Sequence, residues 1–211
     1  NLRGDDVKHT PVFLAFILVE PDRVRLYADV SAFSENIRKA LGEDGVELKD
    51  YMDVYKDLEA VVEDGSLMYD PSKVNYALSQ CVQDSVSVIK TDNNFLLPKS
   101  IKNEVELENL KRVHVKDGVA MTKFMYWLKK NVGNMPITEI SASDYLGELR
   151  SKIDTYLDLS FDTIAGYKEH AAMMHYSATP ETDVLLKPEG MFLVDSGGQY
   201  LEGTTDITRT I

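Results

Sequence analysis

Two aspartates near the end of the 211-residue chain have a spacing that can bind divalent metal ions. The sequence MFLVD predicts a strand with Phe192 and Val194 on one face and Asp195 on the other. Asp206 lies eleven residues beyond Asp195, so a hairpin that closes near 200–203 places both carboxylates on neighbouring strands. Ionised carboxylates held close together repel each other unless a cation lies between them, and their hard oxygens suit Mn²⁺, Mg²⁺ or Ca²⁺.

The same spacing also has an ordinary structural explanation. Aspartates beside a hairpin commonly cap local backbone groups or face solvent, and the spacing alone leaves both interpretations open. Thr208 has the strand parity of Asp206, so its hydroxyl can support a ligand carboxylate. The strand propensity of threonine explains a threonine at this position equally well.

The first part of the chain, residues 1–99, alternates β-type runs with helical ones, which is typical of an α/β domain. The expected elements are strands at 11–19, 24–29, 46–48, 67–69 and 86–90, and helices at 31–41, at 53–63 and after Asp70-Pro71. Ser31 is the expected cap of the first helix, and Gly42 lies just past its end.

Pro98 marks the expected boundary to a second part, residues 100–211. A long helix is predicted from residue 103 to about residue 130, because apolar residues recur there at helical spacing. The predicted buried stripe consists of Leu110, Val113, Ala120, Phe124, Trp127 and Leu128.

A second helix is expected from Ser141 to about residue 157, with Asp144 completing an imperfect capping box. The remainder, residues 160–211, has a β-rich composition. Within it, residues 171–176 (AAMMHY) are interpreted as a strand.

The composition excludes several classes of partner. A net charge of −12 with scattered basic residues opposes binding to nucleic acid or to anionic membrane surfaces. The longest apolar run, residues 12–19, is too short to span a bilayer. The single cysteine, Cys81, allows no internal disulfide and favours a reducing, cytoplasmic setting.

The hairpin segment, DSGGQYLEGTTDITRT at 195–210, closely resembles the metal-binding hairpin of the aminopeptidase P family of creatinase, or pita-bread, metallopeptidases. Residues 160–182 resemble the family's approach to its substrate-facing histidine, and residues 137–144 resemble the segment that opens its second helix. Residues 1–13 resemble part of the domain that precedes the catalytic one.

The resemblance implies two α/β parts. Residues 1–99 would form a non-catalytic, creatinase N-terminal-type (ribonuclease H-like) domain, and residues 100–211 would form the first half of a pita-bread α+β catalytic domain. Because the chain ends in a predicted strand before the remaining family ligands, we expect it to be a fragment that is inactive alone. A further upstream domain is compatible with this interpretation.

The resemblance also implies roles for three residues. The family binds two divalent ions, commonly manganese, through two Asp, one His and two Glu; its two Asp match Asp195 and Asp206, and Asp206 would bridge both ions. His175 matches the histidine that faces the substrate and helps to hold the reacting peptide. Without the resemblance, His175 reads as an ordinary histidine at a strand end. The other histidines, His170, His114 and His9, receive no role.

The implied reaction is removal of the N-terminal residue from a peptide whose second residue is proline, with a metal-bridging hydroxide as the nucleophile. The family also implies a homodimer for the full-length protein. Two other functions remain open. One is a pseudo-enzyme that has lost metal ligands and binds proteins or peptides, and the other is an acidic interaction domain without metal.

Overall fold

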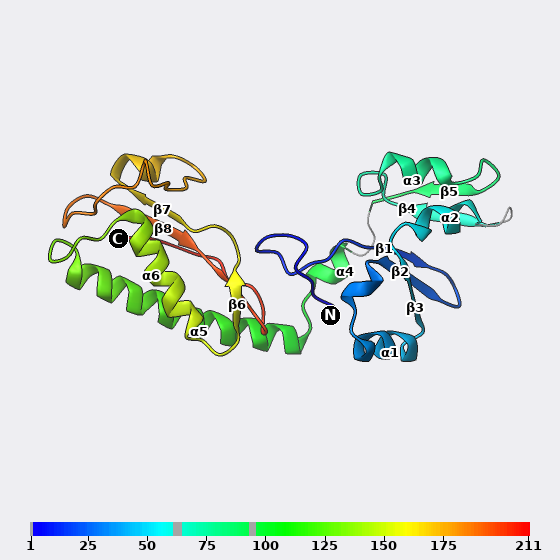
Figure 1. Ribbon diagram of the computed structural model, residues 1–211, viewed down its shortest axis with the longest axis horizontal. Helices are drawn as coiled ribbons and strands as arrows, with labels where there is room; N and C mark the ends of the chain where they lie inside the picture. Colours follow the sequence, from blue (N-terminus) through cyan, green and yellow to red (C-terminus); the bar gives the residue numbers. More distant parts are fainter. Residues whose placement is uncertain (1, 61–64, 93–95) are drawn as a thin grey trace. The chain divides into compact units, whose positions relative to one another are not determined.

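The computed structural model describes residues 2–60, 65–92 and 96–211, and the chain folds as two compact units. The first unit contains residues 1–6 and 12–101, and the second contains residues 7–11 and 102–211. Figure 1 shows the helices and strands of both units.

The first unit is a small α/β domain. Its elements are β1 (Phe16–Val19), β2 (Val24–Ala28), η1 (Val30–Ala32), α1 (Glu35–Glu43), β3 (Val46–Asp50), α2 (Asp53–Glu59), β4 (Ser66–Tyr69), α3 (Tyr76–Cys81), β5 (Ser87–Lys90) and α4 (Leu96–Ser100). Strand β2 pairs antiparallel with β1 and parallel with β3, while β4 and β5 form a separate parallel pair.

Strand β2 is buried on both faces. Tyr27 packs with Val54 and Leu58 of α2, whereas Leu26 and Ala28 pack against a second apolar cluster on the opposite face. Because successive side chains of a strand point to opposite sides, β2 needs apolar cover on both faces, which α2 provides on one face and Phe13, Phe33 and the α1 residue Leu41 provide on the other. The predicted α/β class therefore follows from a strand with consecutive buried residues.

Several predicted elements of this unit have different bounds. Helix α1 begins at Glu35, because the Ser34 hydroxyl accepts a hydrogen bond from the Ile37 amide. The expected cap, Ser31, lies instead in η1, and Gly42 lies inside α1. The prediction for the first helix was therefore wrong at both ends, since a second serine three residues on provided the cap.

The helix predicted after Asp70-Pro71 is also wrong. Asp70 accepts hydrogen bonds from the amide and the hydroxyl of Ser72, which makes a local turn instead of a helix start. Helix α3 begins only at Tyr76, where the Asn75 side chain caps the Leu78 amide. The expected end of the 53–63 helix lies partly outside the described residues, and α4 was not predicted.

The second unit combines two helices with short strands. Its elements are α5 (Glu104–Asn131), α6 (Glu139–Ser151), β6 (Tyr156–Leu159), β7 (Ile164–Tyr167), η2 (Lys168–Ala172), β8 (Phe192–Ser196), β9 (Gly198–Tyr200) and β10 (Ile207–Thr210). The antiparallel sheet has the order β10-β8-β7, and β6 pairs antiparallel with β9.

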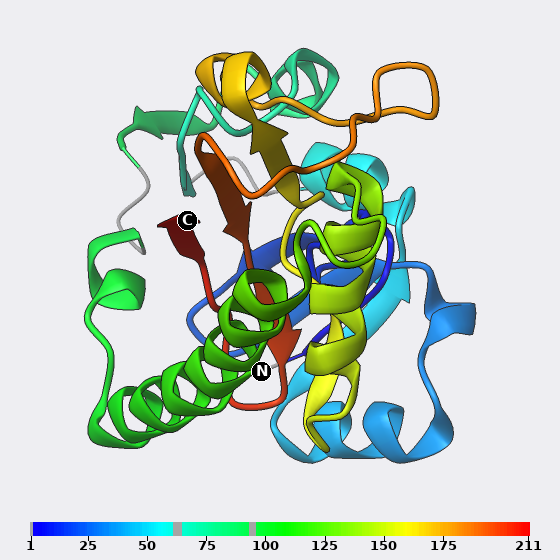
Figure 2. The same ribbon diagram turned by 90° about the vertical axis from the view of Figure 1, so that its left-hand side faces the viewer.

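Helices α5 and α6 lie on one side of this sheet, as Figure 2 shows. Phe124 and Leu128 of α5 and Leu146 of α6 join one apolar core with Phe192 and Val194 of β8. The predicted stripe of α5 is largely confirmed, because Val113, Ala120, Phe124 and Leu128 are buried and Leu110 and Trp127 are half-buried. None of the helices in the described part of the chain has the length and apolar character that crossing a membrane requires.

Two expectations for the second unit were wrong. Helix α6 begins at Glu139, two residues before the expected start, because Thr138 and Ser141 form a reciprocal capping box. It ends at Ser151, six residues before the expected end at about residue 157. Residues 171–176 do not form a strand; Ala171 and Ala172 end η2, and residues 173–175 form the bend and turn that follow it. Their apolar composition suggested a strand, but Met173 and Met174 are exposed.

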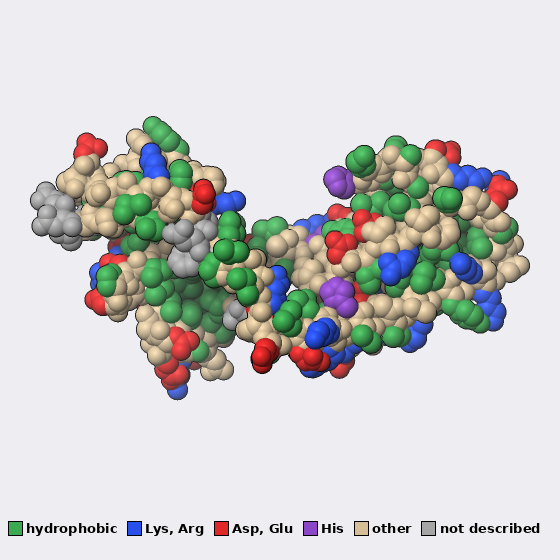
Figure 3. All heavy atoms as spheres, turned by 180° about the vertical axis from the view of Figure 1, so that it is seen from behind, with side chains coloured by type: hydrophobic (Ala, Val, Ile, Leu, Met, Phe, Trp, Pro, Cys, Tyr) green, Lys and Arg blue, Asp and Glu red, His purple; other side chains and the backbone are tan. Residues whose placement is uncertain are grey.

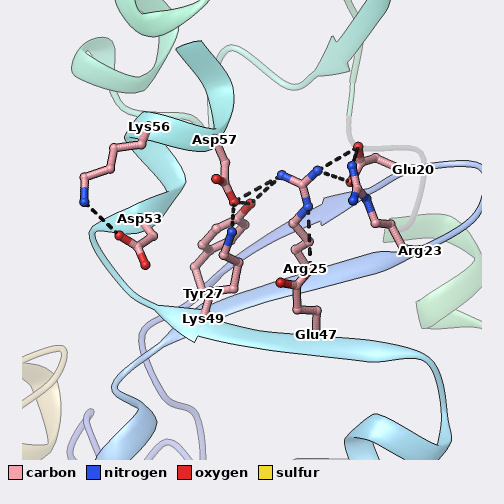
Figure 4. A network of polar contacts seen from close by, with 9 residues as sticks. All are labelled: Glu20, Arg23, Arg25, Tyr27, Glu47, Lys49, Asp53, Lys56 and Asp57. Atoms are coloured by element: carbon pink, nitrogen blue, oxygen red, sulfur yellow. Dashed lines mark hydrogen bonds and ion pairs between the residues drawn. The ribbon is translucent and has the colours of Figure 1, made fainter. Parts of the chain in front are cut away.

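A polar network stabilises the first unit around the Arg25 guanidinium (Figure 4). Arg25 forms ion pairs with Glu20 and with Asp57 of α2, at nitrogen–oxygen distances of 2.9 and 3.1 Å. Asp57 also accepts hydrogen bonds from Lys49 at 2.6 Å and from the Tyr27 hydroxyl at 2.7 Å. Burial acts to raise the pKa of Asp57, but these hydrogen bonds outweigh it and lower that pKa to about 2.

We expect Asp57→Asn to destabilise this unit by about 2 kcal/mol near neutral pH, because the shifted pKa is a stability term. A carboxylate with a lowered folded-state pKa stabilises the fold above its unfolded value of 3.8, and the gain is lost as the pH falls toward about 2. The difference between wild type and variant, measured by urea unfolding, should therefore shrink on acidification. Asp53→Asn is the matched control, because Asp53 pairs with the exposed Lys56 on the same helix. An equal loss in both variants contradicts the prediction.

Candidate active site

Asp195 and Asp206 lie at the two sides of a β-ribbon. Asp195 is half-buried on β8, and the exposed Asp206 immediately precedes β10. In the ladder between these strands Thr208 lies opposite Asp195, and its hydroxyl donates a hydrogen bond of 2.7 Å to Asp195 Oδ1. Because Asp206 is two residues before Thr208, strand alternation assigns it to the face that Thr208 and Asp195 share.

The backbone at Gly197, directly after β8, lies very close to Thr205 and to Ser160. The Gly197 carbonyl accepts a hydrogen bond from the Ser160 amide, and the Gly198 amide is bonded to the Thr205 hydroxyl. A Cβ atom at Gly197 would overlap the Thr205 carbonyl and the Ser160 hydroxyl. Only glycine therefore allows the two backbones to approach this closely.

A buried ion pair fixes the ribbon to the helices. Asp117 of α5 and Arg150 of α6 are both fully buried, and Arg150 Nε donates to Asp117 Oδ1 at 2.6 Å. The Tyr200 hydroxyl of β9 donates to the same oxygen at 2.8 Å. Burial, and then the Asp117 charge, raise the pKa of Tyr200, so its hydroxyl stays protonated. Asp117 lies on the predicted apolar stripe of α5, between Val113 and Ala120, which indicates a buried charge. Nothing in the sequence indicates Arg150 as its partner, because Arg150 is 33 residues away in the chain.

These residues fit part of a metal site. Carboxylates of Asp195 and Asp206 offer hard oxygen ligands of the kind Mn²⁺ and Mg²⁺ prefer, and Thr208 orients one of them. In the residues that the structure describes, no third His, Cys, Asp or Glu completes a metal-binding group. Figure 3 shows acidic side chains near histidines on one face of the second unit, at the right of the view.

His175 lies in the turn that follows η2, and it is exposed. Its backbone is left-handed, with a φ of 56°, a conformation that costs non-glycine residues free energy but is more common for histidine. The alternative interpretation of His175 as a histidine at the end of a strand is wrong, because residue 175 lies in a turn. The next residue, Tyr176, is buried and anchors the turn.

Glu139 was not recognised from the sequence, although it is fully buried at the first position of α6. Its carboxylate accepts hydrogen bonds from the Tyr167 amide at 2.7 Å, from His170 Nδ1 at 2.9 Å and from the Tyr176 hydroxyl at 2.9 Å. The His170 and Tyr176 rings also stack, with centroids 4.6 Å apart. His170, which received no role from the sequence, therefore has Glu139 as a structural partner.

His9 also has partners that the sequence did not reveal. Its two ring nitrogens lie 2.9 Å from Asp158 and 3.0 Å from Asp162, both within the second unit. Burial lowers the pKa of His9, but the hydrogen bonds to both carboxylates outweigh it and raise that pKa. Because two carboxylates accept from the two nitrogens, the imidazolium form fits this contact.

Residues 1–106 match the family described as the creatinase/prolidase N-terminal domain, and residues 108–211 match metallopeptidase family M24. The chain belongs to the creatinase/M24 metallopeptidase family, with a creatinase N-terminal domain followed by part of a pita-bread domain. The predicted family and fold class are thereby confirmed.

Within this family the chain is similar over its whole length to Xaa-Pro aminopeptidases P. It is 36% identical to a probable Xaa-Pro aminopeptidase P of Paracoccidioides brasiliensis and 35% identical to aminopeptidase P2 of Arabidopsis thaliana. All of this chain is covered in both alignments, but only 36% and 34% of the relatives. The chain thus spans about a third of the length of these curated relatives.

A solved structure shows the same arrangement of elements. The X-prolyl aminopeptidase of Caenorhabditis elegans, described as a cytosolic enzyme with a di-nuclear active site, superposes with a TM-score of 0.93 at 28% identity. The alignment covers 99% of this chain and 35% of that protein. The X-Pro aminopeptidase of Thermotoga maritima, at 19% identity and a TM-score of 0.69, shares the fold.

We expect Gly197→Ala to disrupt the ribbon and lower the stability of the second unit, because the added methyl group meets backbone that cannot move independently. Hydrogen exchange of the β8 and β10 amides should accelerate by about tenfold or more. Gly147→Ala on α6 is the matched control, because its methyl group meets open space and alanine favours a helix. Normal protection in Gly197→Ala would show that the close approach is unimportant.

Proposed function

We propose that this chain is part of a metal-dependent aminopeptidase that hydrolyses the N-terminal Xaa-Pro bond of peptides. The observation that carries the proposal is the ribbon with Asp195 and Asp206, in a chain similar throughout to Xaa-Pro aminopeptidases P. An Xaa-Pro bond is a tertiary amide without an N–H group, so a site that does not depend on that donor suits it.

Four residues of this chain each have a part in the proposed reaction. Asp195 and Asp206 hold divalent ions, which when bound activate water and polarise the scissile carbonyl. Thr208 fixes the orientation of the Asp195 carboxylate by its hydrogen bond. His175, exposed on a turn, donates a hydrogen bond to a substrate oxygen as negative charge develops there.

The proposal extends to the setting of the intact protein. Manganese is the proposed metal, because the ligand oxygens are hard and the resemblance is to a manganese-using family. A homodimer is proposed on the same resemblance. A cytoplasmic location is supported by the single cysteine and by the description of the C. elegans enzyme as cytosolic.

In the intact protein, we expect Asp206→Asn to reduce Mn²⁺-dependent hydrolysis of an Xaa-Pro peptide by more than about a hundredfold, the range in which even supporting residues act. The fold should persist, because Asp206 is exposed. Mn²⁺ binding, measured by calorimetry on wild type and variant, should weaken in parallel.

The control for this substitution is Asp154→Asn, which changes an exposed aspartate of the same unit. Undiminished turnover in Asp206→Asn would contradict its role as a metal ligand. A wild-type protein that binds no Mn²⁺ and cleaves no Xaa-Pro peptide would favour a binding module instead.

We further expect the 211-residue chain by itself to be inactive. Two carboxylates supply too few protein ligands for two closely spaced ions, and the described residues contain no group of three or more suitable side chains. The measurement is Mn²⁺-dependent release of the first residue from an Xaa-Pro peptide by the purified chain. Turnover comparable to that of the intact protein contradicts this expectation.

A further inference from the structure

The buried carboxylate of Glu139 is connected to the turn that carries His175. Glu139 belongs to α6, whereas its three donors come from the end of β7, from η2 and from the residue that follows His175. A single side chain therefore joins a rigid helix to both sides of the turn.

We propose that Glu139 is a positioning residue that sets the place of His175 for the substrate, through Tyr176 and His170. The inference rests on the proposed function, since it assigns a purpose to the position of His175. It assigns Glu139 no contact with the substrate or with a metal ion.

The first argument is that both oxygens of the Glu139 carboxylate accept hydrogen bonds from residues in and next to this turn. Oε1 accepts from the Tyr167 amide and Oε2 from the Tyr176 hydroxyl, while His170 Nδ1 lies within 3.0 Å of both oxygens. Carboxylate oxygens accept hydrogen bonds, so this contact fits the His170 tautomer that has its proton on Nδ1. A fully buried carboxylate without such donors would be strongly destabilising, and this one is satisfied only while the turn keeps its place.

The second argument is the contrast between neighbouring residues of the turn. Met174 is 92% exposed and His175 is exposed, whereas Tyr176 is 9% exposed and hydrogen-bonded to Glu139. Exposed residues receive little packing that could fix a backbone conformation. The left-handed backbone of His175 therefore depends on the anchor that directly follows it.

The third argument is that the anchor has a rigid base. Thr138 and Ser141 cap α6, and the Ile140 amide donates to Asp183, so the first turn of this helix is fixed from two sides. The Leu186 amide also donates to the Ile137 carbonyl just before the helix. The backbone at Glu139 is thus held by these hydrogen bonds and does not move with the turn that carries His175.

The test is a double-mutant cycle in the intact protein with Mn²⁺ and an Xaa-Pro peptide. We expect Glu139→Gln to lower kcat by about 10- to 100-fold with a smaller change in KM, because a small misplacement of a positioned group has effects of this size. In a His175→Ala background, the same substitution should lower kcat by less than about threefold, since the positioned group is already absent.

A residue that only stabilises the fold would reduce turnover by the same factor in both backgrounds, and this result would overturn the proposal. Glu189→Gln is the matched control, because Glu189 pairs with Lys168 of the same η2 segment at the surface. It should change kcat by less than about twofold, as exposed pairs contribute little.

Hydrogen exchange provides a readout that needs no activity. Amides of residues 171–178 should exchange faster in Glu139→Gln than in wild type, and Glu189→Gln should leave them unchanged. If Glu139→Gln does not fold, Tyr176→Phe replaces it, because it removes one hydroxyl and keeps the ring that stacks on His170. Unchanged exchange in the variant that folds would overturn the proposal.

The two proposals fail in different ways. A wild-type protein without Xaa-Pro hydrolysis in the presence of Mn²⁺ contradicts the proposed function, and with it the purpose assigned to His175; the exchange experiment then tests only whether Glu139 holds the turn. An active wild type with equal effects of Glu139→Gln in both backgrounds contradicts only the role of Glu139.

Discussion

The arrangement of the second unit depends on one buried ion pair, between Asp117 and Arg150. Removing two charges from water costs free energy unless the charges are paired and hydrogen-bonded. A shift of either helix would leave the charge on the other helix buried without its partner. The Tyr200 hydroxyl adds β9 to this pair. Strand β9 lies within the segment that joins Asp195 to Asp206, and the ion pair therefore holds the candidate metal ribbon against both helices.

The four notable carboxylates of this unit differ in how many donors each receives. Glu139 accepts from three residues and Asp117 from two, and both are fully buried. Asp195 accepts one side-chain hydrogen bond, from Thr208, and Asp206 is exposed. Lone pairs that are already used cannot bind a cation, so Asp117 and Glu139 serve the structure, while Asp195 and Asp206 keep oxygens available for ligands.

Local patterns predicted the elements best where one interaction dominates. The apolar spacing of α5 and the alternation of β8 were both found, because one buried face fixes each of them. The predictions failed where a local hydrogen bond from a polar side chain competed with the predicted helix or strand. Ser34 replaced Ser31 as a cap, and Asp70 formed a turn instead of a helix start. The apolar run 171–176 contains the end of η2 and a turn that is anchored by Tyr176.

The sequence by itself determined the α/β class, the family and the place of Asp195 and Asp206 on one β-ribbon, because these follow from local patterns and from motifs within short segments. Only the tertiary structure showed that Asp117 meets Arg150 and that Glu139 meets His170 and Tyr176. These partners lie 31 to 37 residues apart, and no local periodicity relates them. Contacts of this kind form only after helices and strands pack, since packing alone removes the water that would otherwise satisfy each charge.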